Sequence, residues 1–141
     1  MGKTTALLLG AVFFFAPRVF GGALDLPEWE AKIIEEVAQE YHLNKTETKL
    51  LYIIRKVENG RQGREFGVLV PQAMRYKNAP DKTKSFRLQA QWAAGTIKRR
   101  YKGDLLAFAK RWAPVGAKND PKGLNKNWYK NARYYMEGGV K

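Results

Sequence analysis

The sequence predicts a small, mainly α-helical domain of about five helices, with a short β-hairpin insert after the second helix. Apolar residues recur at helical spacing in several segments, and residues that favour helix N-termini precede most of them. A short apolar run over residues 66–70, bounded by Gly67 and Pro71, instead has the character of a strand. A chain of 141 residues suits one compact domain with its own core.

The first two helices are expected at residues 25–41 and 44–58. Asp25 can cap the first and Pro27 fits its first turn, and apolar residues then follow every four positions: Trp29, Ile33, Val37 and Tyr41. The second begins with Asn44 and Glu47, which have the spacing of a capping box. The Asn59-Gly60 pair marks its end, because both residues tolerate the left-handed backbone of a helix C-cap.

Three further helices follow the insert at residues 66–70. The third is expected to start at Thr83 or Ser85 and to reach about Tyr101, with Trp92 in the core because it lies mid-helix. Asp104 can cap the fourth, which covers residues 105–112. After a loop rich in Pro, Gly, Asn and Asp, the last helix covers residues 125–136.

Residues 1–23 have the layout of a secretory signal peptide. Lys3 supplies the positive charge, residues 6–16 are an unbroken apolar run, and Gly21 and Ala23 are small residues at the expected cleavage position. The apolar run is too short to span a bilayer as a helix, so no stable membrane span is expected; an uncleaved anchor is the alternative. The prediction is an exported protein, periplasmic or extracellular, cleaved after Ala23, with one domain over residues 24–141.

Charge and composition limit the possible functions. The net charge is +13, and loss of the leader would remove two of these charges. Such a balance predicts a polyanionic partner, and export favours cell-wall polymer over nucleic acid. The chain has no Cys, one His (His42) and one Ser (Ser85), so it lacks the residues for thiol chemistry, for a zinc site and for a plausible catalytic triad. No metal or cofactor is expected, and carboxylate chemistry remains.

Glu58 is the candidate for that chemistry. It follows an apolar helical run and lies on the same helix face as Leu51 and Ile54. Burial and the negative end of the helix dipole would both raise its pKa, which suits a general acid. A solvated charge at a helix end is the alternative. The glycines at 60, 63 and 67 and the following apolar segment favour the catalytic interpretation.

Two stretches of the chain carry a resemblance to a known superfamily. Residues 54–60 (IRKVENG) with residues 65–69 (EFGVL) look like a catalytic-Glu helix and its adjoining β-region. Residues 111–116 (RWAPVG), with Asn119, Asp120 and the Asn125–Trp128 segment, look like the far wall of the same cleft. The chain thereby resembles the α+β lysozyme-like superfamily, in particular small phage and bacterial lytic-transglycosylase-like proteins.

The resemblance implies a peptidoglycan-cleaving glycosidase in which Glu58 protonates the bond between N-acetylmuramic acid and N-acetylglucosamine. Glu65 is the best-placed second carboxylate, followed by Asp81. Water or the sugar's own C6 hydroxyl could accept the glycosyl group, giving hydrolysis or a 1,6-anhydro product. The expected substrate-binding residues are Phe66, Gly67, Trp112, Asn119, Asp120, Asn125 and Trp128.

The expected partner is the glycan strand of peptidoglycan, cut by a monomer that serves a secretion, conjugation or phage-entry apparatus. Two alternatives come from other classes of protein. One is a non-catalytic basic module that binds nucleic acid or glycan, and the other is a structural component of a virion or an envelope machine.

Overall fold

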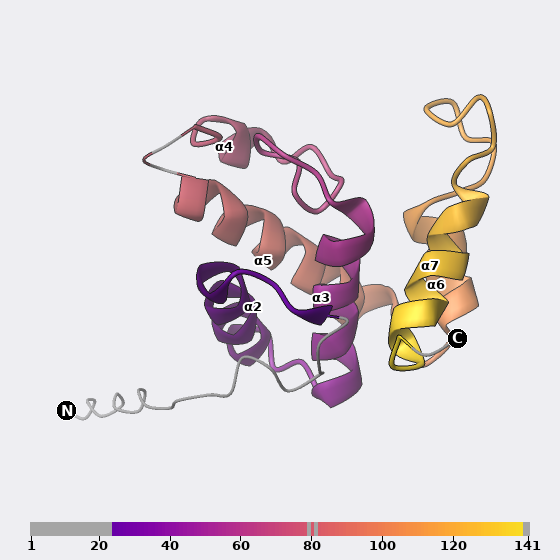
Figure 1. Ribbon diagram of the computed structural model, residues 1–141, viewed down its shortest axis with the longest axis horizontal. Helices are drawn as coiled ribbons and strands as arrows, with labels where there is room; N and C mark the ends of the chain where they lie inside the picture. Colours follow the sequence, from indigo (N-terminus) through magenta and orange to yellow (C-terminus); the bar gives the residue numbers. More distant parts are fainter. Residues whose placement is uncertain (1–23, 79, 81, 140–141) are drawn as a thin grey trace.

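The computed structural model describes residues 24–78, 80 and 82–139. The predicted signal peptide and Asp81 lie outside these residues. The described part is mainly helical, as the sequence predicts, and contains these helices (Figure 1): α2 (Glu28–Glu40), α3 (Lys45–Glu58), α4 (Pro71–Met74), α5 (Lys82–Arg100), α6 (Leu105–Trp112) and α7 (Lys126–Met136).

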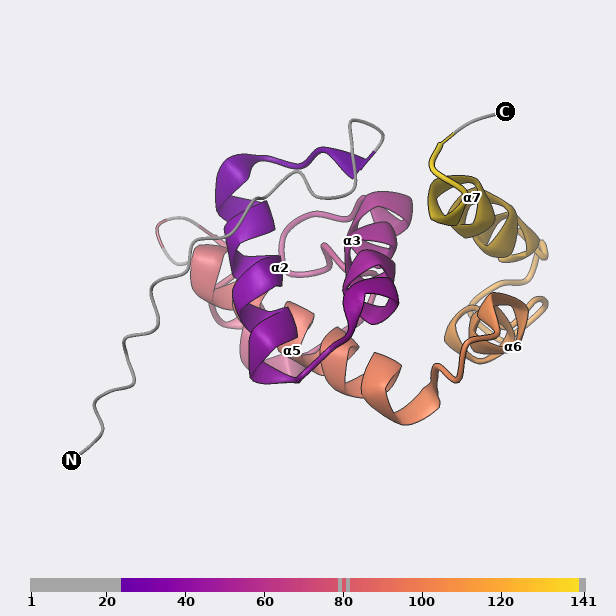
Figure 2. The same cartoon turned by 90° about the horizontal axis from the view of Figure 1, so that it is seen from below.

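Helix α3 is the centre of the molecule. It packs against α2, α5 and α7, while α6 pairs with α7 and α4 lies on α5. Both Figure 1 and Figure 2 show α2 on one side of α3, with α6 and α7 on the opposite side. The apolar face of α3 fills the space between these neighbours, and Leu50, Leu51, Ile53 and Ile54 are fully buried. Burial of such a set is the main force that holds the helices together.

Polar pairs fix α3 against α2. The Arg55 guanidinium donates to both carboxylate oxygens of Glu30, with Nε–Oε1 at 2.8 Å and an Nη2–Oε2 distance of 3.0 Å. One turn earlier, the Tyr52 hydroxyl donates to Glu35 at 2.7 Å. These bonds satisfy polar groups that the packing of the two helices removes from water.

Helix starts agree with the sequence in two cases and differ in two. The Asn44–Glu47 capping box and the Asp104 cap, which accepts from the Ala107 N–H at 3.0 Å, are both present. Helix α2 instead takes Pro27 as its N-cap, with no side-chain cap, so the prediction of an Asp25 cap is wrong. Helix α5 begins at Lys82, which places the predicted caps Thr83 and Ser85 inside it.

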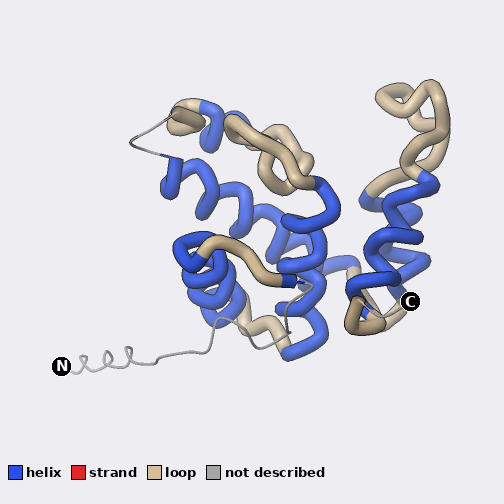
Figure 3. The backbone as a smooth tube through the Cα atoms, viewed as in Figure 1, coloured by secondary structure: helices blue, strands red, loops and turns tan. Residues whose placement is uncertain are grey.

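The predicted β-hairpin is also wrong: the described residues contain no strand, and residues 59–70 form turns and loop (Figure 3). The backbone there pairs with itself and with a side chain. Gly67 N–H donates to Arg64 at 2.9 Å, and Phe66 N–H donates to the Gln89 side chain at 3.2 Å. Gly67 has a φ of 75°, and Pro71 starts α4, so the apolar run has neither the length nor the backbone for a paired arm.

Among the described helices, none combines the length and the apolar character that crossing a membrane would require.

Candidate active site

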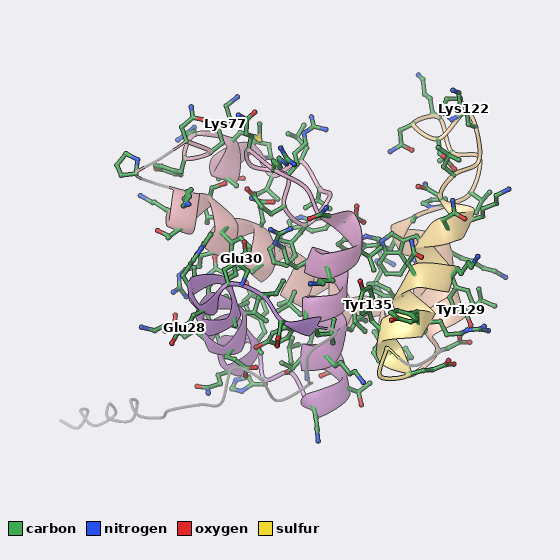
Figure 4. All side chains as sticks on the ribbon, viewed as in Figure 1. Glu28, Glu30, Lys77, Lys122, Tyr129 and Tyr135 are labelled. Carbon is green, nitrogen blue, oxygen red and sulfur yellow. The ribbon has the colours of Figure 1, made fainter. Side chains whose placement is uncertain are left out.

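The candidate site lies at the C-terminal end of α3, where Glu58 is the last helical residue. Two irregular segments, residues 59–70 and 113–125, extend past this end on either side (Figure 1). Figure 4 shows Lys77 just beyond α4, which follows the first segment, and Lys122 on the second segment. Asn59 ends the helix in the left-handed conformation with φ at 49°, as the Asn59-Gly60 pair predicts. The Glu58 carboxyl contacts Gly67, which is in the first segment, and Trp112 and Trp128, which lie just before and just after the second.

Glu58 accepts hydrogen bonds from two tryptophans. The indole Nε1 of Trp112, at the end of α6, donates to Glu58 Oε2 at 2.8 Å. The indole Nε1 of Trp128, in the first turn of α7, donates to the same oxygen at 2.8 Å. The carboxylate thereby joins three helices that are distant in sequence.

An aromatic cluster orients these two indoles. Phe108, one turn before Trp112 on α6, stacks on the Trp112 ring with centroids 5.6 Å apart and planes 20° apart. Trp112 and Trp128 lie 6.4 Å apart, and Trp128 is only 6% exposed. A ring held by such packing cannot swing its N–H away from Glu58 without opening the core.

Gly67 lies directly against the other side of the Glu58 carboxyl. A Cβ built on Gly67 would lie well inside 3.0 Å of Glu58 Oε1 and of its carboxyl carbon. The φ of 75° independently favours glycine at this position. Residue 67 therefore has to lack a side chain if Oε1 is to keep its place.

Burial raises the pKa of Glu58, while the hydrogen bonds from Trp112 and Trp128 lower it; burial is the larger effect. The raised pKa that the sequence predicts is therefore present. An indole N–H can only donate, so Oε2 accepts two bonds whether or not the carboxyl is protonated. The acid proton consequently belongs on Oε1, the oxygen beside Gly67.

Glu65 is hydrogen-bonded to α5 and makes none of the contacts to Glu58 described above. Its Oε1 accepts a hydrogen bond from Gln89 Nε2 at 2.6 Å, and Gln89 is fully buried in α5. The same amide nitrogen lies 3.2 Å from the Ser85 hydroxyl, and the Gln89 carbonyl accepts from Phe66 N–H. This network fixes the turn onto α5. A second catalytic carboxylate at Glu65 stays a prediction, and Asp81 lies outside the described residues.

Phe66 has its side chain in the core, although the sequence suggested a substrate-binding residue. It is 0% exposed and packs 5.0 Å from the Phe86 ring. Its side chain therefore anchors the segment that carries Gly67 and presents no surface to a ligand.

Asp120 organises the loop between α6 and α7. Its carboxylate accepts backbone N–H bonds from Gly116 at 3.0 Å, Leu124 at 2.7 Å and Asn125 at 3.1 Å. Burial would raise the pKa of Asp120, but the three donors outweigh it and lower the pKa. The Asn125 side chain donates to the Pro114 carbonyl at 2.9 Å. These two residues thus shape the loop, while Asn119 is exposed on it.

The structure brings together four of the residues singled out from the sequence: Glu58, Gly67, Trp112 and Trp128. Two contributors were missed. Gln89, a buried polar residue of α5, holds the turn that contains Glu65 and Phe66 by hydrogen bonds to both residues. Trp92, expected in the core, is 45% exposed at the edge of the aromatic cluster, 5.9 Å from Trp112.

Within the part of the chain that the structure describes, no three His, Cys, Asp or Glu side chains gather as a metal site would require. Comparison of the chain with protein-family models, with curated proteins and with solved structures gave no match in any of the three.

Proposed function

We propose that this protein is a peptidoglycan-cleaving glycosidase of lysozyme-like fold in which Glu58 is the general acid and then the general base. The observation that carries the proposal is the environment of Glu58: a partly buried carboxyl of raised pKa, with Oε2 bound by two indole N–H groups and Oε1 against a glycine. A protonated acid with one oxygen oriented by two donors and the other beside a residue that has no side chain suits proton donation to a leaving group.

In the proposed reaction, Glu58 gives the Oε1 proton to the glycosidic oxygen as the bond to the sugar C1 breaks. The sugar passes through an oxocarbenium-like state, and the new Glu58 carboxylate keeps its two indole hydrogen bonds. It then accepts a proton from the nucleophile that attacks C1. If the nucleophile is the C6 hydroxyl of the same sugar, the product is a 1,6-anhydro sugar; if it is water, the product is a reducing end.

The lytic transglycosylase branch has the better support. A hydrolase that uses two carboxylates needs the second one across the scissile bond. Glu65 accepts a hydrogen bond from Gln89, so the contacts of the described residues bring no second carboxylate to Glu58. A lone acid/base is sufficient when the substrate supplies its own nucleophile.

The net charge of +13 fits anionic cell-wall polymer as the substrate surface. The proposal includes export by a signal peptide over residues 1–23. It also includes local opening of the cell wall for a secretion, conjugation or phage-entry apparatus.

Incubation with purified sacculi tests the proposal. The protein should release soluble muropeptides, and mass spectrometry should show 1,6-anhydro ends. Glu58→Gln should lower the rate by about 10² to 10⁴, the usual contribution of a general acid. Its amide oxygen can still accept both indole bonds, so the unfolding midpoint should stay close to that of the native protein. Full activity in Glu58→Gln would refute the catalytic role.

A second candidate function is a non-catalytic basic binding module. The hydrogen bonds that join Glu58 to α6 and α7 would then serve stability alone, and the charge would serve binding. This alternative predicts no muropeptide release and steeply salt-dependent affinity for DNA or RNA. Titrating affinity against salt for oligonucleotide and for glycan separates the two functions.

A further inference from the structure

A groove of about 310 Å³ lies beside the Glu58 site, between the C-terminal half of α5 and helix α6. Its walls include two tryptophans, three arginines and one aliphatic residue: Val68, Trp92, Arg99, Arg100, Arg111 and Trp112.

The groove adjoins the candidate active site at two of these residues. Trp112 lines the groove and also donates its indole N–H to Glu58 Oε2. Val68 lines it too and directly follows Gly67, which lies against the Glu58 carboxyl. A polymer bound at Glu58 would therefore have this groove next to it.

The groove is strongly cationic. Arg99, Arg100 and Arg111 are all exposed, and no acidic residue is among those that line it. Arg99 makes a long contact, 3.4 Å, with the Thr96 hydroxyl. Within the described ranges, none of the three guanidinium groups forms an ion pair.

Trp92 adds an apolar platform to these charges. It is 45% exposed, which is unusual for a tryptophan on a packed helix, and lies 5.9 Å from Trp112 at the edge of the aromatic cluster. A flat exposed indole beside unpaired guanidinium groups suits a ligand with both an apolar face and an anion, since guanidinium forks pair with carboxylates.

We propose that this groove is a subsite for the carboxylate-bearing peptide substituents of the glycan strand, with Trp92 under the sugar or acyl part and Arg100 and Arg111 on the carboxylate. The inference rests on the proposed function and adds selectivity: strands with free peptide carboxylates bind better than neutral ones. A nucleic-acid strand is a poorer fit, because successive bases need successive exposed aromatic platforms, and of the two tryptophans in this groove Trp92 is exposed while Trp112 is partly buried.

Binding is measured on the full chain with Glu58→Gln, so that no turnover occurs. The probes are a disaccharide-peptide muropeptide with free carboxylates, the same molecule with its carboxylates methyl-esterified, and a single-stranded oligonucleotide. We expect esterification to weaken binding about tenfold or more, the scale of one good charged contact. Adding Arg100→Gln and Arg111→Gln should abolish that difference and leave the affinity for the ester unchanged.

Lys32→Gln with Lys45→Gln is the matched control, because it removes two exposed positive charges on α2 and at the start of α3. It should keep the tenfold preference. Equal affinity for the free and esterified muropeptides would overturn the inference. So would an oligonucleotide that binds more tightly than the muropeptide and loses its affinity in the double Arg variant.

Failure of the subsite and failure of the proposed function give different results. If the native protein releases muropeptides but esterification does not change binding, the function stands and the subsite is wrong. If the carboxylate preference is present but the native protein releases no muropeptides, the groove stands as a binding site and the catalytic role of Glu58 is wrong.

Discussion

Gly67 offers a sharp test of the candidate site, because the chain provides a matched control. Gly67 and Gly116 both have a φ of 75°, a conformation that costs an L-residue about 1 kcal/mol or more. A Cβ on Gly116 would meet nothing within 4 Å, whereas a Cβ on Gly67 would overlap the Glu58 carboxyl. Replacing each by Ala therefore applies the same backbone strain with and without a clash at the acid.

The magnitudes follow from these contacts. To restore an ordinary carbon separation of about 3.5 Å, the Glu58 carboxyl has to withdraw on the order of 1 Å. A displacement of this size costs about 10² in rate. Gly116→Ala should lose about 1 kcal/mol of stability from strain alone. Gly67→Ala should lose about 1–3 kcal/mol more, since the withdrawal also disturbs the hydrogen bonds to the buried Trp128 indole and the partly buried Trp112 indole.

The assays are muropeptide release from sacculi and unfolding in urea, run on both variants. We expect Gly116→Ala to keep its rate within about twofold, since a Cβ there contacts nothing within 4 Å, and Gly67→Ala to lose about a hundredfold. Equal rates in the two variants would refute the claim that Gly67 holds open the space for the acid oxygen.

Three further predictions use other contacts. Trp112→Phe removes one of the donors that lower the Glu58 pKa, so this pKa should rise. The alkaline limb of the pH–rate profile should then move to higher pH. An unchanged profile would contradict the assignment of Glu58 as the acid. The raised folded-state pKa also means that the stabilising effect of Glu58 is full below its unfolded-state pKa and is lost as the pH rises through the folded-state value. Urea unfolding across that window should show a steeper loss in the native protein than in Glu58→Gln, and parallel curves would contradict it. Arg55→Met leaves the Glu30 carboxylate, 6% exposed, without its partner and should cost about 3–5 kcal/mol in urea unfolding, with partial recovery when Glu30→Gln is added; a loss within error would show that the pair is not buried in solution.

Local signals account for most of the helices. The Asn44–Glu47 capping box, the Asp104 cap and the Asn59-Gly60 stop each act within one turn, so the sequence contains the whole interaction.

The prediction of a β-hairpin is wrong because a strand depends on a partner strand. Residues 66–70 have an apolar character, but Phe66 pairs with Gln89, a residue more than twenty positions away. The prediction that Trp92 lies in the core is wrong for a related reason: its mid-helix position is visible in the sequence, but the packing of α6 against α5 decides whether the side chain is covered.

The sequence alone predicted the helical class, the net positive charge, and Glu58 as a candidate acid at the end of an apolar helical run. These depend on composition and on neighbours within a few residues. The tertiary structure decided what surrounds that acid: Trp112, Trp128 and Gly67, which come from three separate segments, and the arginine-lined groove beside them. Such contacts form only when distant segments pack, because burial and side-chain direction are set by the whole core.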